Sequence, residues 1–163
     1  ALSGVVPQVA AMLGHCAAGT SYIPALADFV PMVRGISSMA LAGRHLVKAA
    51  TGEDVTEEEM GGADVHTKIS GVADLAVDDD ISCLDTVKRY LSFFQGPVAD
   101  WAAPDQERLR TLVPERRKQV YDVRAVVHGL ADVDSVLELR RGFGASAGMG
   151  GLTVCAASAV LPW

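Results

Sequence analysis

The chain is poor in aromatic residues, cysteine and positive charge. Of its 163 residues 6% are aromatic and three are cysteine, and 14 Lys and Arg stand against 20 Asp and Glu, for a formal net charge of -6. Cys16, Cys83 and Cys155 are odd in number and lack zinc or CxxC spacing, so we expect reduced, small apolar residues and no disulfide framework. The acidic balance argues against nucleic-acid and anionic-membrane partners, which require a basic face.

Long apolar runs are also absent. The longest fall well short of the roughly 20 residues of a membrane helix and are broken by Gly, Pro or charge, so we expect no membrane partner. The chain begins without the charged region, apolar core and cleavage site of a signal peptide. We therefore expect a cytoplasmic protein, or one of the mitochondrial matrix in a eukaryote. A hydrophobic content of 50% is enough for one ordinary core.

The acidic chain has one basic cluster. It consists of Arg108, Arg110, Arg116, Arg117 and Lys118. Charge runs are usually exposed, so a solvated, partly helical linker surface is favoured over a phosphate-binding role.

Strand and helix signals alternate in the first half of the chain. The apolar run 9–13, bounded by Pro7 and Gly14, is typical of a strand covered on both faces, as in a parallel sheet. The pattern further predicts helices over 21–27 and 43–50, the second ended by Gly52, and strands over 29–33 and 38–42. Such alternation indicates the α/β class.

Two later helices carry capping signals. Thr56 and Glu59 form a capping-box pattern, and the helix that they begin is expected to end at Gly61-Gly62. The acidic run 78–80 begins a longer helix to about Phe94, whose apolar residues keep helical spacing.

The stretch from Gln95 to Pro114 has the composition of a linker, with Gly96, prolines and many charges. The elements expected beyond it are a helix over 120–130 capped by Asp122, another helical turn or two over 133–139, and strands over 142–147 and 152–160 joined by a hairpin turn at 148–151.

Residues 14–29 are the most informative segment. They begin Gly-His-Cys-Ala-Ala-Gly-Thr-Ser-Tyr-Ile-Pro-Ala and follow the first predicted strand. A strand that breaks at a glycine, passes through small residues and enters a helix leaves backbone N–H groups free, and these can hold an anion or oxyanion. The alternative is that the glycines only permit close packing of helix and sheet.

A second glycine-rich segment, residues 58–73, reads Glu-Glu-Met-Gly-Gly-Ala-Asp-Val-His-Thr-Lys-Ile-Ser-Gly-Val-Ala. The two segments resemble, in the same order, the Gly-Pro-Cys-Ala-Gly-Gly-Ala-x-Tyr-x-Pro-Ala and Glu-Leu-Gly-Gly-Ala-x-x-His-x-x-x-Ser-Gly-Val-Ala signatures of one family. That family is the carboxyltransferase (beta) subunit of biotin-dependent acyl-CoA carboxylases, of the propionyl-CoA carboxylase type. A looser similarity continues through residues 121–124 to the C-terminus.

The resemblance implies a crotonase-like (ClpP/crotonase) fold, an α/β superhelix of ββα turns, of which this chain is a part. Residues 1–94 would be the later part of the N-terminal domain, 95–118 a linker, and 119–163 the start of the C-terminal domain. The full-length subunit would form a homo-oligomer, a hexamer built from dimers. The 163 residues alone would be inactive.

The activity implied is transfer of carboxylate from carboxybiotin to an acyl-CoA, a coenzyme A thioester such as propionyl-CoA, through an enolate. The carboxylated biotin is held by a biotin carboxyl carrier protein and supplied by a biotin carboxylase subunit, and no metal is implied for this chain. Two backbone oxyanion holes would serve the thioester and biotin oxygens. The alternatives are a decarboxylase or transcarboxylase subunit of the same fold, and a non-catalytic assembly module.

The resemblance places one oxyanion hole at the N–H groups of Ala18 and Gly19, with the thioester oxygen favoured by analogy with crotonases and the biotin oxygen left open. The substrate-binding residues implied are Ala17, Thr20, Tyr22, Pro24, Gly61, Gly62, Ser70 and Gly71. Tyr22 and Pro24 either line the acyl pocket or belong to the core.

Three residues need separate interpretation. Ala18 stands where the family has glycine, and its Cβ is tolerated only where φ is negative. His15 stands where the family has proline, and we interpret it as a packed or solvent-contacting residue rather than a catalyst. His66 has no partner at a metal-ligand spacing, so we interpret it as a hydrogen-bonded structural histidine in a turn beside the site.

Overall fold

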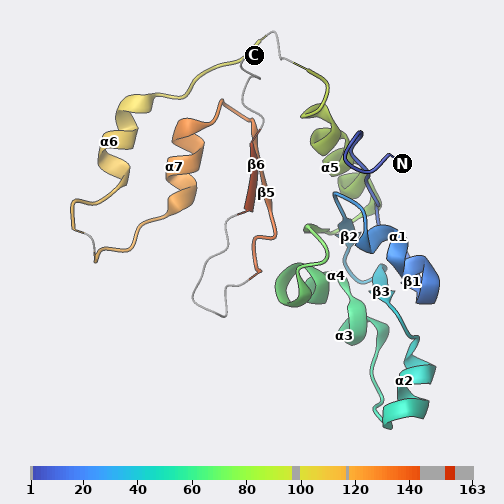
Figure 1. Ribbon diagram of the computed structural model, residues 1–163. Helices are drawn as coiled ribbons and strands as arrows, with labels where there is room; N and C mark the ends of the chain where they lie inside the picture. Colours follow the sequence, from blue (N-terminus) through green and yellow to red (C-terminus); the bar gives the residue numbers. More distant parts are fainter. Residues whose placement is uncertain (1, 97–99, 117, 144–152, 157–163) are drawn as a thin grey trace.

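The computed structural model describes residues 2–96, 100–116, 118–143 and 153–156, the last four as backbone only. Figure 1 shows the elements from β1 to α5 gathered on one side and α6, α7 and the β5–β6 pair on the other. Within these ranges, no helix combines the length and apolar character needed to cross a membrane.

Two parallel strand pairs organise the first half. β1 (His15–Ala17) pairs with β3 (Ser38–Ala40), and β2 (Pro31–Val33) pairs with β4 (Leu75–Val77). The parallel pairing follows the alternation of strand and helix signals. It also sets β3 beside the strand that leads into the small-residue segment.

The strand predicted over 9–13 is only partly correct. The run is joined to its neighbour by isolated parallel bridges, Val9 to Phe29 and Met12 to Met32, and the first regular strand comes after Gly14, not before it. Met12 is buried, whereas Leu13 is 40% exposed. Because Leu13 at the end of the run is exposed to solvent, the run is not covered on both faces.

The sequence signals predict the helices found over 22–25, 44–51, 57–61 and 80–92, but not the helical turns over 63–70. The helical elements of the first half are the 3-10 turn η1 (Ala18–Ser21), α1 (Tyr22–Ala25), α2 (Arg44–Thr51), α3 (Glu57–Gly61), α4 (Ala63–Val65), the π turn η2 (His66–Ser70) and α5 (Asp80–Ser92). The capping box of Thr56 and Glu59 is present, and the Asp79 side chain accepts a hydrogen bond from Ser82 N–H at 2.7 Å. Gly52 ends α2 with φ of 80°.

The core lies between the strand pairs and the helices that follow them. One cluster contains the buried residues Met12, Val30, Met32, Met39, Ala63 and Ala73. A second joins Phe29 and Tyr90, whose rings stack at 4.2 Å between centroids, to Leu139 far along the chain. Ala63 and Ala73 belong to the second signature, so burial of this cluster fixes that segment against β2 and β3.

The described residues of the second half form short helices and two paired strands. They are the 3-10 turn η3 (Gln106–Arg108), α6 (Leu109–Leu112), α7 (Val123–Leu130), β5 (Val136–Leu139) and β6 (Thr153–Ala156). The helix predicted over 120–130 is confirmed, and Asp122 accepts from Arg124 N–H at 2.9 Å as its cap.

The helical turns predicted over 133–139 are wrong. Residues 136–139 form β5, which pairs antiparallel with β6. Tertiary packing decides this, because Leu139 enters the core against Phe29 and Tyr90. Gly142 and Phe143 lie in a turn, so the strand predicted over 142–147 does not begin at Gly142. The hairpin turn predicted at 148–151 lies outside the described residues.

Candidate functional site

The first signature forms a strand that turns directly into a helix. β1 ends at Ala17, and η1 and α1 follow without an intervening loop. Buried Ser21 anchors this turn, since its hydroxyl lies 3.1 Å from the Cys16 carbonyl and 2.8 Å from the Ala40 carbonyl and shares its one proton between them. The Thr20 hydroxyl donates back to the Ala17 carbonyl at 2.6 Å.

Ala18 is the turning point, and its conformation corrects the sequence-based expectation. Its φ is +56°, in the left-handed region, and not negative. Ala17 before it is extended, with φ of -131° and ψ of 158°. An alanine in the left-handed region is disfavoured by roughly 1–2 kcal/mol, which explains why the resembling family has glycine there. The chain adopts this conformation because strand and helix are both anchored around it.

The turn can hold a negatively charged oxygen. A left-handed residue followed by helical residues directs successive N–H groups toward one concavity, and the first N–H groups of a helical turn have no partner within it. The side chains from Ala17 to Thr20 are exposed, and a Cβ added to Gly19 would meet no atom within 4 Å. Ala18 and Gly19 are therefore exposed in this part of the protein.

Tyr22 and Pro24 differ in their exposure to solvent. Pro24 is buried, which matches the core alternative, whereas Tyr22 is 58% exposed. Ile23 and Leu26 on the same turn are 72% and 80% exposed. Tyr22 is thus the one of this pair placed where it can contact a ligand.

The second signature lies one strand away from the first. β3 pairs with β1, and Ser38 of β3 forms an isolated antiparallel bridge with Gly62. Gly61 is buried so closely against β3 that an added Cβ would lie 2.1 Å from the Met39 carbonyl oxygen. The fold therefore brings Gly61 and Gly62 toward Ala17 through β3.

His66 forms two hydrogen bonds, as its interpretation as a structural histidine expects. Nε2 is 2.7 Å from the Met39 carbonyl oxygen, and Nδ1 is 2.8 Å from Oγ of Ser70. Gly71 has φ of 70°, and a Cβ there would meet the Phe143 ring at 2.6 Å.

His15 is in contact with solvent and with two partners. Its Nδ1 lies 2.8 Å from Oγ of Ser38 and 2.8 Å from Oε2 of Glu57, and its side chain is 63% exposed. Both partners share one nitrogen, so the three groups do not form a relay through the ring of the Ser-His-acid kind. Nothing in the described part of the chain gathers three His, Cys, Asp or Glu side chains into a possible metal site.

A pocket of about 330 Å³ lies beside the second signature, since Thr67 and Lys68 contribute to its lining. Its charged lining residues include Arg34, Lys68 and Arg141, which the sequence analysis does not single out. Lys68 donates to Asp64 at 3.0 Å and, with Arg34, holds the pKa of that carboxyl below its usual range. Arg34 also pairs with Asp78 at 2.6 Å. These positive charges are thus largely neutralised within the chain.

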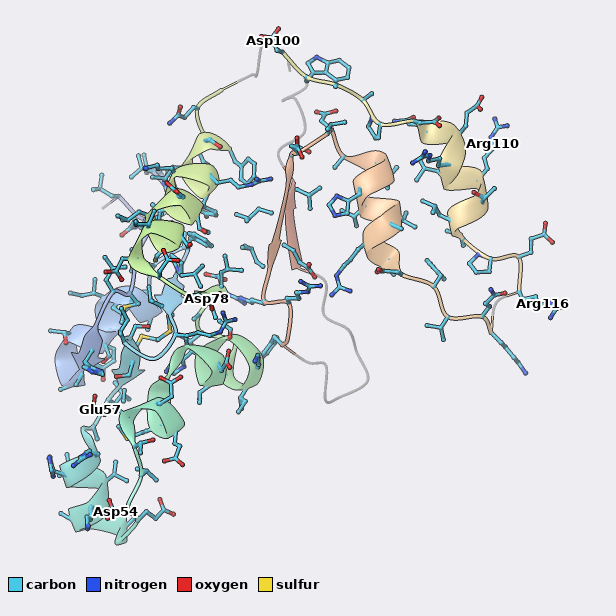
Figure 2. All side chains as sticks on the ribbon, turned by 180° about the vertical axis from the view of Figure 1, so that it is seen from behind. Asp54, Glu57, Asp78, Asp100, Arg110 and Arg116 are labelled. Carbon is cyan, nitrogen blue, oxygen red and sulfur yellow. The ribbon has the colours of Figure 1, made fainter. Side chains whose placement is uncertain are left out.

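The basic cluster lies apart from the signatures. Figure 2 shows Arg110 and Arg116 on the opposite side of the molecule from Glu57. Arg108, Arg110, Arg116 and Lys118 are exposed, and Arg117 is outside the described residues. This exposure matches the linker-surface interpretation.

Sequence reasoning missed Ser21, Ser38 and Met39. Ser21 fastens the turn, and Ser38 and Met39 contact the two histidines. Single Ser and Met residues carry no distinctive pattern. Ser38 and Met39 enter the site only through the pairing of β1 with β3, which is not local.

Known proteins match the chain over most of its length. The model of the carboxyl transferase domain family matches residues 1–153. The carboxyltransferase subunit of propionyl-CoA carboxylase from Haloferax mediterranei is 40% identical over 150 residues, which is 86% of this chain and 29% of that protein. The alpha subunit of methylmalonyl-CoA decarboxylase from Veillonella parvula is 34% identical over 147 residues, covering 85% and 29%.

A solved structure, the transcarboxylase 12S hexamer with hydrolysed methylmalonyl-coenzyme A bound, superimposes with a TM-score of 0.81 at 38% identity. The superposition covers 95% of this chain and 31% of that one, and it confirms the crotonase-like α/β fold. The chain thus spans less than a third of the length of these relatives. The pairing of β1 with β3 brings the two signatures together, and the family model matches residues 1–153. This chain therefore belongs to the carboxyl transferase domain family.

Proposed function

We propose that the full-length protein is the carboxyltransferase component of a biotin-dependent acyl-CoA carboxylase that acts on propionyl-CoA or a similar thioester. The observation that carries the proposal is the strand-to-helix turn at Ala18 and Gly19, exposed and anchored by Ser21. It is supported by membership of the family and by similarity to a propionyl-CoA carboxylase subunit.

The chemistry needs a site that stabilises negative charge on oxygen. Loss of the α-proton of an acyl thioester places charge on the thioester oxygen, and backbone N–H groups fixed before the reaction stabilise it without reorganising. Ala18 and Gly19 supply such donors, and the open space at Gly19 admits the thioester. When bound, carboxybiotin would supply the carboxyl group. Its carbon–nitrogen bond would break as the carboxyl group is transferred to the substrate α-carbon, and the biotin nitrogen left behind would take up the α-proton.

The proposed partners are an acyl-CoA, a biotin carboxyl carrier protein and a biotin carboxylase subunit. Homo-oligomer assembly is proposed because the similar transcarboxylase 12S is described as a hexamer. A decarboxylase or transcarboxylase subunit is the second candidate, favoured by similarity to the Veillonella decarboxylase and to transcarboxylase 12S.

The test is a reconstitution of the full-length protein with biotinylated carrier, biotin carboxylase, ATP and bicarbonate. The proposal expects labelled bicarbonate to be incorporated into propionyl-CoA. Carboxyl transfer from methylmalonyl-CoA to the carrier, without net carboxylation by the carboxylase partner, would support the second candidate instead. Failure to bind any acyl-CoA in calorimetry would favour the non-catalytic assembly module.

A further inference from the structure

We propose that His66 is a positioning residue that fixes the backbone of β3 and, through β3, the Ala18–Gly19 turn. Its consequence for catalysis rests on the proposed function. The connection begins with the 2.7 Å hydrogen bond between Nε2 of His66 and the Met39 carbonyl. Met39 of β3 pairs with Cys16 of β1 in the parallel register. Cys16 precedes Ala18 by two residues.

The hydrogen-bond partners show which ring nitrogen of His66 is a donor. A carbonyl oxygen can only accept, so Nε2 of His66 carries the proton and donates it to Met39. In the neutral ring Nδ1 is then an acceptor, and the Ser70 hydroxyl, 2.8 Å away, donates to it. His66 is also held through its backbone, because its N–H donates to the Gly62 carbonyl at 3.1 Å and its carbonyl accepts from Ala73 at 3.2 Å.

Gly61 makes this hydrogen bond possible. A Cβ at Gly61 would lie 2.1 Å from the Met39 oxygen and 3.2 Å from Nε2 of His66, inside the space that the hydrogen bond occupies. Real Cβ atoms do not approach so closely, so any larger residue would displace the carbonyl or the ring. The glycine and the histidine of the second signature thus serve the same contact with β3.

β3 connects the His66 hydrogen bond to the first signature, because β3 pairs with β1. Its consecutive carbonyls at Met39 and Ala40 are held by different side chains, His66 and Ser21. Ser21 also holds the Cys16 carbonyl, so it fastens β1 and β3 at the start of the turn. Movement of β3 would therefore move the strand end from which the Ala18 and Gly19 N–H groups are aimed.

The local backbone of the second signature suits this role. His66 to Ser70 form a π turn that ends at Gly71 with φ of 70°. Single π turns are rare and occur frequently at functional sites. Here the wide turn sets the Ser70 hydroxyl against Nδ1 of His66.

The test compares three variants of the full-length protein. His66→Gln keeps an N–H donor at about the reach of Nε2, His66→Ala removes it, and Ser70→Ala removes only the partner of Nδ1. Hydrogen exchange measured by mass spectrometry follows peptides that cover β1 with η1, and α5 as a control for global unfolding. Carboxylation kinetics with propionyl-CoA separate kcat from KM.

We expect His66→Ala to raise exchange in the peptide of residues 15–21 while α5 is unchanged, and to lower kcat by roughly 10- to 100-fold with KM changed less than about threefold. His66→Gln should restore most of both signals, and Ser70→Ala should show a smaller effect of the same kind. Equal effects of Ala and Gln, or unchanged exchange in residues 15–21, would overturn the proposal. If the wild-type protein carboxylates no acyl-CoA, the proposed function fails, and the exchange data still decide whether His66 positions the turn.

Discussion

The buried carboxylate of Asp74 accepts a hydrogen bond from Nε of Arg140 at 2.8 Å, although 66 residues separate the two in the sequence. Asp74 also accepts from Val30 N–H at 2.9 Å, and its carbonyl accepts from Arg140 N–H at 2.7 Å. One acidic residue thereby connects the start of β2, the start of β4 and the end of β5. The contact holds the second half of the chain against the core of the first.

Removal of Arg140 should destabilise the protein because it leaves the Asp74 carboxylate buried with one partner fewer. We expect Arg140→Leu to lower the free energy of unfolding by about 1–3 kcal/mol in denaturant titrations. Arg141→Leu is the matched control, since Arg141 is 73% exposed and lies 3.6 Å from Glu138. Equal losses for the two variants would contradict a special role of the Asp74 contact.

Replacement of Ala18 by glycine should stabilise the protein. Glycine adopts φ of +56° without the Cβ clash, which outweighs its greater flexibility in the unfolded chain by about 0.5–1 kcal/mol. The neighbouring Ala17→Gly change is the control. Because Ala17 is extended and unstrained, it should lose about 0.5–1 kcal/mol. Thermal unfolding that moves both variants in the same direction would show that Ala18 is not strained.

An alanine at position 61 should be poorly tolerated. Its Cβ would collide with the Met39 carbonyl, and displacement of β3 should reduce stability by about 1–3 kcal/mol. Gly14→Ala, next to β1, is the control because a Cβ there meets no atom within 4 Å. Circular dichroism during denaturant unfolding measures both, and a Gly61→Ala protein as stable as Gly14→Ala would refute the close packing.

The capping box should make part of the stability dependent on pH. The Thr56 backbone N–H, and secondly its hydroxyl, hold the pKa of Glu59 below its usual range. The folded pKa is therefore lower than the unfolded one. The contribution is fully present above the unfolded value of about 4.3 and is lost as pH falls through the folded pKa.

Glu59→Gln removes this dependence. The difference in unfolding free energy between wild type and variant should be constant at neutral pH and shrink below about pH 4. Glu107→Gln, far from α3, controls for the change in net charge. A difference that stays constant down to pH 2 would exclude the capping carboxylate as its source.

Local signals were readable from the sequence, and long-range ones were not. The capping box at Thr56 and the glycine stop at Gly52 depend on residues within one turn, so their types alone predict them. Residues 133–139 were predicted as helix because short apolar spacings are ambiguous, and the strand is decided by Leu139 packing against Phe29. The left-handed Ala18 could not be predicted, since alanine adopts that conformation only where the surroundings impose it.

We propose that the backbone N–H of Gly19 stabilises the thioester oxygen during carboxyl transfer. Replacement of the Ala18–Gly19 amide by an ester removes this donor and leaves every side chain in place. The Gly43–Arg44 ester is the control, because Arg44 begins α2 and its N–H also lies in the first turn of a helix.

The decisive measurement is kcat for propionyl-CoA carboxylation by the full-length protein with its carrier and carboxylase. The account predicts that the Ala18–Gly19 ester lowers kcat by roughly 100- to 1000-fold, the usual loss for one oxyanion donor, while the control ester changes it less than about twofold. A kcat for the Ala18–Gly19 ester equal to that of the control would contradict the account.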